Sequence, residues 1–174
     1  MLFRSELQRL RPEDVDLAGR WIHIRSRAGA ETKTRESRKV PIHPRLRAVL
    51  EALPRRSRPW LFTAAPSAQS PAGDNQFSTK RLSDQFRRLV SSLGLPVGRA
   101  NGYVVHSLRH FFETFAVNAG IPQRAVDTWL GHRSDRSMGA VYYRLSDVDS
   151  RAFMSKVPFG TTDAPSDTIT EGTK

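Results

Sequence analysis

The 174-residue sequence has no cysteine, which excludes disulfide bonds and thiolate metal ligands. It also has no apolar run near the ~20 residues that a membrane-spanning helix needs. The first residues, MLFRSELQRLRPED, lack the apolar core of a signal peptide. We therefore expect a cytoplasmic protein with no membrane partner, whose length suits one domain with a core of its own.

Acidic residues are scarce relative to basic ones. The chain has 17 Asp and Glu against 28 Lys and Arg, a formal net charge of +11. Most of the basic residues are arginines, whose planar guanidinium suits two-point contact with phosphate. They are spread along the chain rather than gathered on one amphipathic helix, which favours nucleic acid over a membrane surface as the partner. The simpler alternative is a basic surface that serves only solubility.

A small antiparallel sheet is predicted near the start of the chain. The segment WIHIRS, 21–26, alternates apolar and polar residues as a half-buried strand does. RKVPI, 38–42, is predicted to be a second strand, with Pro41 at an edge or strand end. The polar segment 28–36 between them is typical of a hairpin connection. WLFTA, 60–64, is a third short apolar run.

The rest of the chain is predicted to be mainly helical, because apolar residues recur every three or four positions. Gly120 and Gly131 follow two of these helices at C-cap positions, and Pro122 suits the first turn of the second. The predicted helices cover residues 4–11, 44–52, 78–93, 108–119, 122–130, 136–143 and 147–156. The segment 65–76 is predicted to be a loop and the polar tail 160–174 to be disordered.

Three separate segments carry residues suited to chemistry. HSLRH, 106–110, places His106 and Arg109 three residues apart, so that both face one side of a helical turn, with His110 four residues beyond His106. LGH, 130–132, ends in His132 and is followed ten residues later by Tyr142. Lys33 lies in the polar hairpin connection. The set contains neither a pair of carboxylates nor a full set of metal ligands.

Such a set is suited to breaking and rejoining a phosphodiester. A tyrosine can attack the phosphorus and hold it as a phosphotyrosyl ester. Arginine and histidine can stabilise the charge on the non-bridging oxygens, and a lysine can protonate the leaving 5′-oxygen. This chemistry needs neither a metal nor a nucleotide cofactor.

Each residue also has a plainer interpretation when it is taken alone. His106 and His110 could bind a metal, but no third ligand follows in a recognised pattern. Tyr142 could be a half-buried aromatic residue, and Lys33 an ordinary exposed lysine. His132 could be a histidine at a helix end, without a role in chemistry. Only the combination favours a catalytic role.

The combination resembles the tyrosine recombinases, the family of phage integrases and Xer-type resolvases. HSLRHFFETFAVNAG resembles the family's H-x-L-R-H box, and AVDTWLGHRSDRSMGAVYYRLS resembles its LGH … Y-x-H ending. TKTRESRKVPIHPRL resembles its β-hairpin segment, and ELQRLRPEDVDL resembles a run near the start of its catalytic domain. The resemblance covers about residues 4–156 in the family's order. It implies a helical domain with a small three-stranded sheet, so the fold class is mainly α with a small antiparallel β-sheet (α+β).

The resemblance also implies a role for each residue of the set. Tyr142 would be the nucleophile and Arg109 the second catalytic arginine. His106 would serve as an acid/base and phosphate contact, and His132 would hydrogen-bond the scissile phosphate. Lys33 would be the general acid. The partner implied is double-stranded DNA, bound by a homo-oligomer that is a tetramer in the family.

The sequence departs from the family at the first catalytic arginine. That arginine stands three residues before the glutamate of R-x-x-E-L, which is Glu6 here, and the position holds Phe3. Arg4 is one residue away, and helical geometry turns it about 100° from the expected direction. Either Arg4 substitutes or the arginine is lost because the chain starts inside the motif. We favour the loss.

A second departure concerns the tyrosine. The spacing from His132 to Tyr142 is one residue longer than the family's commonest spacing, and Tyr143 follows at once. The flanking YYRLS selects Tyr142, with Tyr143 as the alternative. Arg144 takes the place of the family's following histidine and, with His110, is expected near the phosphate or just behind the catalytic residues.

We expect residues 1–159 to form the catalytic domain, truncated at its N-terminus and without the family's core-binding domain, so that DNA binding is weaker and more sensitive to salt. Residues 160–174 form the tail. The leading hypothesis is a site-specific DNA recombinase. The alternatives are a DNA-binding remnant of such an enzyme with impaired cleavage, and a helix-turn-helix regulator built from 108–119, Gly120 and 122–130.

Overall fold

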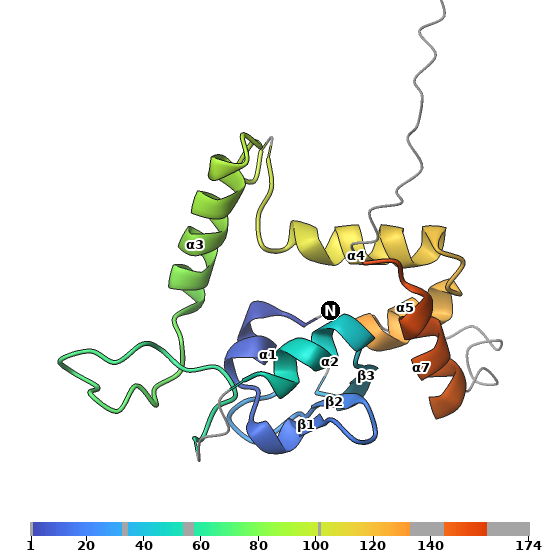
Figure 1. The fold of residues 1–174 in the computed structure, drawn as a ribbon, viewed down its shortest axis with the longest axis horizontal. Helices are drawn as coiled ribbons and strands as arrows, with labels where there is room; N and C mark the ends of the chain where they lie inside the picture. The colour runs from blue at the N-terminus through green and yellow to red at the C-terminus, as the bar shows by residue number, and fades with distance from the viewer. Residues whose placement is uncertain (1, 33–34, 54–57, 101, 133–144, 160–174) are drawn as a thin grey trace, which may run out of the picture.

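A three-stranded antiparallel sheet lies at one end of the molecule, in the order β1-β2-β3 (Figure 1). The computed structural model describes residues 2–32, 35–53, 58–100, 102–132 and 145–159. The strands are β1 (Val15–Asp16), β2 (Trp21–Ile24) and β3 (Arg38–Pro41). β2 pairs with both neighbours, and its partners across β3 include Ile22 with Val40. The sheet thus buries an apolar face while its last strand leads directly into a helix.

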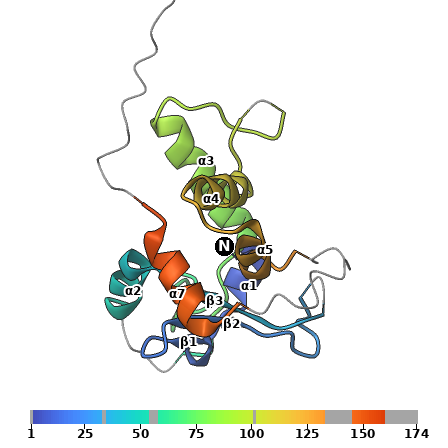
Figure 2. The ribbon, with the colours of Figure 1, turned by 90° about the vertical axis from the view of Figure 1, so that its right-hand side faces the viewer.

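Within those ranges the chain forms six α-helices and one 3₁₀ helix. Helix α3 stands away from the sheet, whereas α2 and α7 lie near it, as the two perpendicular views show (Figures 1 and 2). The helices are α1 (Arg4–Gln8), η1 (Pro12–Asp14), α2 (Pro44–Glu51), α3 (Thr79–Ser92), α4 (Ser107–Asn118), α5 (Gln123–Leu130) and α7 (Asp147–Lys156).

Short-range signals explain where several helices begin and end. The hydroxyl of Ser78 accepts the backbone N–H of the third residue of α3, and Ser146 does the same for α7. Gly120 and Gly131 follow α4 and α5 with φ of 78° and 70°, the left-handed region that favours glycine. These glycines end the two helices that carry the histidines and the arginine of interest.

Helix α5 supplies the centre of the core. Its residues Val126, Trp129 and Leu130 are buried, and it packs against β3 and α4. The indole Nε1 of Trp129 donates a hydrogen bond of 2.8 Å to the buried hydroxyl of Ser150 on α7. Burial of this apolar face, together with the satisfied indole, fixes α5 and α7 against the same strand. The C-terminal end of α5 is therefore held firmly in place.

The structure confirms the predicted fold class, and most predicted helices and both predicted strands are present with ends shifted by one or two residues. The helix expected over 4–11 is shorter, because it ends at Gln8 and a 3₁₀ turn follows from Pro12. The third strand comes from Val15–Asp16, and the apolar run 60–64 contributes only an isolated bridge, Thr63 with Gln76. The predicted helix 136–143 and the tail 160–174 lie outside the described residues.

No α-helix among the described residues is both long enough and apolar enough to cross a membrane.

Candidate active site

Three residues of the predicted set line one cavity. Its volume is about 610 Å³, and its walls include His106 and Arg109 from the start of α4 and His132 from the turn after α5. His110 and Arg38 line the same cavity. Three imidazoles and two guanidiniums therefore surround one space, together with the carboxylates of Glu6 and Glu113. Arginine and histidine side chains are donors that suit a phosphate.

Arg109 forms the floor of this cavity. Its side chain is 4% exposed, and its Nη2 donates to the backbone carbonyl of Leu130 at the end of α5. Burial lowers the pKa of Arg109, and the positive charge of Arg38 lowers it further. A guanidinium stays charged through such shifts because its ordinary pKa is above 12. Arg109 is therefore a fixed, partly desolvated positive charge.

Arg38 also binds the C-terminal end of α5. Its Nη1 and Nη2 donate to the two carboxylate oxygens of Glu6 at 2.8 and 2.9 Å, and its Nε donates to the carbonyl of Trp129 at 3.0 Å. Two arginines thus satisfy consecutive carbonyls at the negative end of α5. We did not predict Arg38 from the sequence, where its only signal is the arginine of RKVPI after the hairpin.

His106 is stacked between two other rings. Its ring centroid lies 4.9 Å from that of His110 in an edge-to-face contact and 6.2 Å from the nearly parallel ring of Phe3. Burial lowers the pKa of His106, and the nearby charges of His110, Arg109 and Arg4 lower it further. These effects favour the neutral form of His106, which is the form that can accept a proton.

His132 is accompanied by a group of polar residues on α4 and α5. Its Nδ1 lies 3.4 Å from Oδ1 of Asp127. The amide Nε2 of Gln123 donates to the same oxygen at 2.9 Å and to Oε1 of Glu113 at 3.2 Å. Glu113, Asp127 and His132 come close enough together to hold a metal ion. Because the Gln123 amide already donates to both carboxylates, hydrogen bonding accounts for the group without one.

Of the remaining predicted site residues, the structure describes only Arg4. Arg4 is exposed, and its Nη1 donates to the hydroxyl of Ser83 on α3 at 2.6 Å. It does not line the cavity that contains His132, but it lines a neighbouring cavity together with His106 and Arg109. Lys33, Tyr142, Tyr143 and Arg144 lie outside the described residues, so their predicted roles remain predictions. The ring of Phe3, the residue at the sequence position where the family's first arginine is expected, lies with its centroid 4.2 Å from the guanidinium carbon of Arg109.

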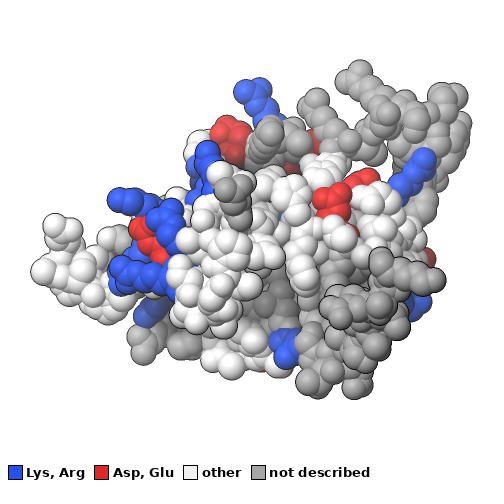
Figure 3. Space-filling view, turned by 90° about the horizontal axis from the view of Figure 1, so that it is seen from above, with Lys and Arg blue, Asp and Glu red and all other residues white. Residues whose placement is uncertain are grey.

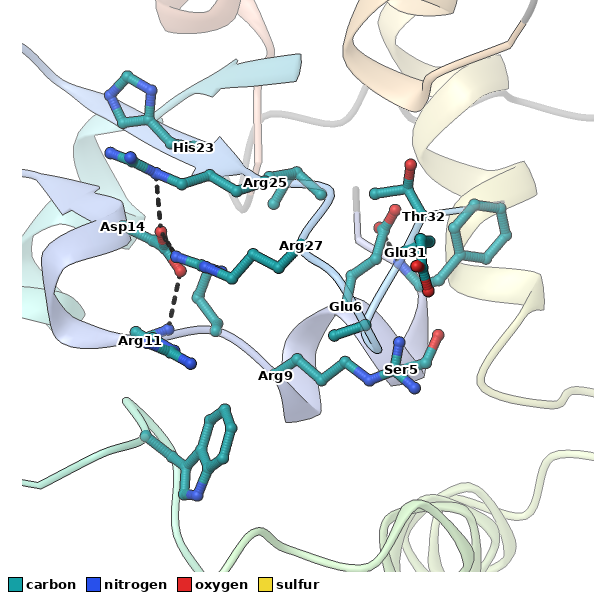
Figure 4. A pocket seen from close by; sticks show the side chains of 15 residues that line it. Ser5, Glu6, Arg9, Arg11, Asp14, His23, Arg25, Arg27, Glu31 and Thr32 are labelled. Atoms are coloured by element: carbon teal, nitrogen blue, oxygen red, sulfur yellow. Dashed lines mark hydrogen bonds and ion pairs between the residues drawn. The ribbon is translucent and has the colours of Figure 1, made fainter. Parts of the chain in front are cut away.

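Further arginines gather next to the cavity. A neighbouring pocket beside α1 and the hairpin is lined by Arg9, Arg11, Arg25 and Arg27, as Figure 4 shows. Arg25 and Arg27 pair with the buried carboxylate of Asp14, at 3.1 and 2.6 Å. This pairing holds the segment that follows β2 against the 3₁₀ helix.

Basic side chains also cover the exposed face of α3. Seen from above, they gather on the side of the molecule that carries this helix (Figure 3). The exposed residues there are Lys80, Arg81, Arg87 and Arg88. A polyanion that reached the cavity would also meet this surface.

Comparison with known proteins identifies the family. The model of the phage integrase family matches residues 2–148. The chain belongs to the phage integrase family. A curated relative, the type 1 fimbriae regulatory protein FimB of Escherichia coli strain K12, is 32% identical over 148 residues, which cover 83% of this chain and 66% of FimB.

Solved structures of other integrases share the fold. The integrase from mycobacterium phage Brujita has a TM-score of 0.65 at 22% identity, over 92% of this chain and 48% of that one. XerA recombinase has a TM-score of 0.56 at 24% identity, over 86% and 50%. The Tn1549 transposon integrase, solved in complex with transposon right end DNA, has 0.57 at 22%, over 88% and 54%. The chain therefore spans about half the length of the proteins in these structures.

Proposed function

We propose that this chain binds duplex DNA and that its cavity holds the scissile phosphate for strand cleavage by tyrosine. The observation that carries the proposal is that His106, Arg109 and His132, from separate segments of the sequence, line one cavity. Arg109 would donate to one non-bridging oxygen from below. His106 and His132 would contact the oxygens from the two sides, so that charge developing in the transition state meets fixed donors.

The reaction follows from the chemistry of the groups. The phenol oxygen of Tyr142 attacks the phosphorus, and its proton passes to a base, for which the neutral His106 is suited. The bond from phosphorus to the 5′-oxygen breaks, and Lys33 protonates the leaving oxygen. The product is a 3′-phosphotyrosyl ester, which a free 5′-hydroxyl reverses by attack on the phosphorus. His110 and Arg144 are proposed to stand close to the phosphate without taking part in a proton transfer.

The proposed partner is double-stranded DNA, bound by a homo-oligomer. The net charge of +11 and the basic face of α3 support it, as does the DNA in the Tn1549 integrase complex. Residues 1–159 are proposed to be the catalytic domain. Because the surface relies on many Lys and Arg contacts with phosphates, affinity should fall steeply as salt rises.

The contact between Phe3 and Arg109 favours a second function, which is DNA binding with impaired cleavage. The guanidinium of Arg109 lies over the ring of Phe3, the residue at the sequence position where the family's first arginine is expected. An aromatic ring cannot neutralise an oxyanion. Loss of one such donor typically lowers a rate about 10²–10³-fold.

A nicked suicide substrate separates the two functions. Cleavage next to the nick releases a short fragment and traps the protein on DNA as a covalent complex. We expect a covalent band with the wild-type chain and none with Tyr142→Phe, while Tyr143→Phe retains it. A band lost only in Tyr143→Phe would reassign the nucleophile.

DNA binding is measured in parallel by fluorescence anisotropy on the same duplex. Binding without a covalent band supports the second function. A chain that neither binds nor cleaves contradicts both. A helix-turn-helix regulator would instead bind DNA with an affinity that depends on residues 122–130 and would form no covalent complex.

A further inference from the structure

The turn that presents His132 also brings a carboxylate to its ring. After α5 the backbone N–H of His132 donates to the carbonyl of Asp127 at 3.0 Å, and that of Gly131 to Thr128 at 3.3 Å. With Gly131 in the left-handed region, these bonds form a Schellman motif. This motif places the second residue after the helix beside the residue five positions earlier. Here that pair is His132 and Asp127.

Asp127 lies at a position in α5 where the helix dipole disfavours a carboxylate. It lies in the last turn of α5, at the negative end of the helix dipole, where cations and not anions are stabilised. Its Oδ1 accepts the Gln123 amide and faces Nδ1 of His132. A carboxylate at this position needs such donors, and the imidazole N–H is one of them.

We propose that Asp127 is a positioning residue for His132. Its carboxylate accepts the Nδ1–H of the imidazole and so selects one tautomer and one ring orientation. Nε2 is then the nitrogen available to the cavity that His132 lines. The sequence signature is an aspartate five residues before the histidine, D-T-W-L-G-H at 127–132. The effect of Asp127 on catalysis rests on the function proposed above. The effect of Asp127 on the tautomer of His132 does not depend on that function.

The first experiment is independent of cleavage. Protein labelled with ¹⁵N-histidine is studied by long-range ¹H–¹⁵N correlation at neutral pH, which distinguishes Nδ1–H from Nε2–H imidazoles. His132, assigned by His132→Gln, should be in the Nδ1–H form in the wild type. Asp127→Ala and Asp127→Leu should both lose that single form, because neither side chain has an acceptor. Alanine and leucine both favour the helix, so one variant gives a result even if the other fails to fold.

Glu113→Ala is the matched control, because it removes a negative charge from the same group of residues without touching the acceptor of His132. It should leave the tautomer unchanged. An equal change in Glu113→Ala, or no change in either Asp127 variant, overturns the proposal. Addition of EDTA to the wild type tests the metal alternative. A change in the His132 signals on chelation would assign Asp127 as a metal ligand and would also overturn the proposal.

The second experiment measures the consequence. With the nicked substrate, Asp127→Ala should form the covalent complex about tenfold more slowly than the wild type while its affinity for DNA is unchanged, as is typical when the partner that orients an active histidine is removed. Thr128→Ala, an exposed change in the same turn, should cleave at the wild-type rate. Failure of the wild type to cleave contradicts the proposed function alone, whereas an Asp127→Ala variant that cleaves at the wild-type rate contradicts the positioning role.

Discussion

The ring of Phe3 lies over the guanidinium of Arg109, with 4.2 Å between the ring centroid and the guanidinium carbon. The backbone N–H of Phe3 donates to Glu6 at 2.8 Å, and that same carboxylate binds Arg38. The first residues of the chain are thereby attached to the cavity floor. This arrangement fills the place of an expected cation with an uncharged ring that stacks on a cation.

Replacing this ring by a cation tests whether it limits cleavage. Phe3→Arg should raise the rate of covalent complex formation on the nicked substrate by about 100-fold, because it adds one donor to the transition-state oxyanion. Phe3→Leu removes the ring without adding charge and should leave the rate low. A Phe3→Arg variant that cleaves no faster than Phe3→Leu would show that the missing arginine is not what limits the chain.

Breaking the ion pair between Glu6 and Arg38 should destabilise the fold. Their side chains are 9% and 11% exposed, so Glu6→Gln leaves an uncompensated, largely buried guanidinium. We expect the free energy of unfolding to fall by about 3 kcal/mol, measured by chemical denaturation. The control is Glu51→Gln, which breaks the exposed pair with Arg47 and should cost about 0.5 kcal/mol or less. Equal losses in the two variants would contradict a structural role for the buried pair.

Alanine substitutions at Gly120 and Gly131 distinguish the cost of a strained backbone from the cost of steric crowding. Gly120 and Gly131 have φ of 78° and 70°, but a Cβ on Gly120 would meet nothing within 4 Å, whereas one on Gly131 would lie 3.0 Å from the Arg38 side chain. Gly120→Ala should therefore cost about 1 kcal/mol for the left-handed backbone alone. Gly131→Ala should cost more and should also weaken DNA cleavage, because Arg38 must move. Thermal and chemical denaturation of both variants provide the comparison.

Stability should fall as the pH drops below 6.5. Burial is the main cause that lowers the pKa of His43 and of His106 below that ordinary value. The unfolded chain then binds more protons than the folded one, so unfolding becomes easier as acid is added, and the stability is fully present only above pH 6.5.

His43 offers a direct test of this pH dependence. Its Nδ1 accepts the N–H of Arg45 at the start of α2, and its Nε2 donates to the carbonyl of Val157 at 3.0 Å, an arrangement that only the neutral ring can make. His43→Asn keeps a good helix cap but does not titrate, so its unfolding free energy should depend less on pH than that of the wild type. A parallel pH dependence in both proteins would exclude His43 as a source.

The sequence predicted the elements that carry local signals. The apolar repeat and glycine stops locate α4 and α5, and the motifs around Arg109 and His132 select residues that the fold brings to one cavity. The strand Val15–Asp16 was missed because two residues are too short to show alternation. The run 60–64 has strand-like composition but finds its backbone partner in Leu10 instead, through the N–H of Leu61.

The rest of the site depends on contacts between distant segments. Glu6 and Arg38 are 32 positions apart, and nothing in the sequence distinguishes either of them from an exposed charged residue. Phe3 could be seen as a departure from the family, but its stacking on Arg109 follows from how α1 and α4 meet. Asp127 beside His132 could have been predicted from the Gly131 turn alone, because the motif fixes the spacing.

The carbonyls at the end of α5 are bound by arginines that come from very different places in the chain. Arg38 reaches Trp129 across 91 positions, and Arg109 reaches Leu130 across 21. Contacts with such large separations form slowly during folding, after local helices are in place. A chain with all its helices but with β3 not yet docked on α5 would lack the bond from Arg38 to Trp129, so the cavity proposed to hold the phosphate would be incomplete. Cleavage activity would then appear only in the last cooperative step of folding.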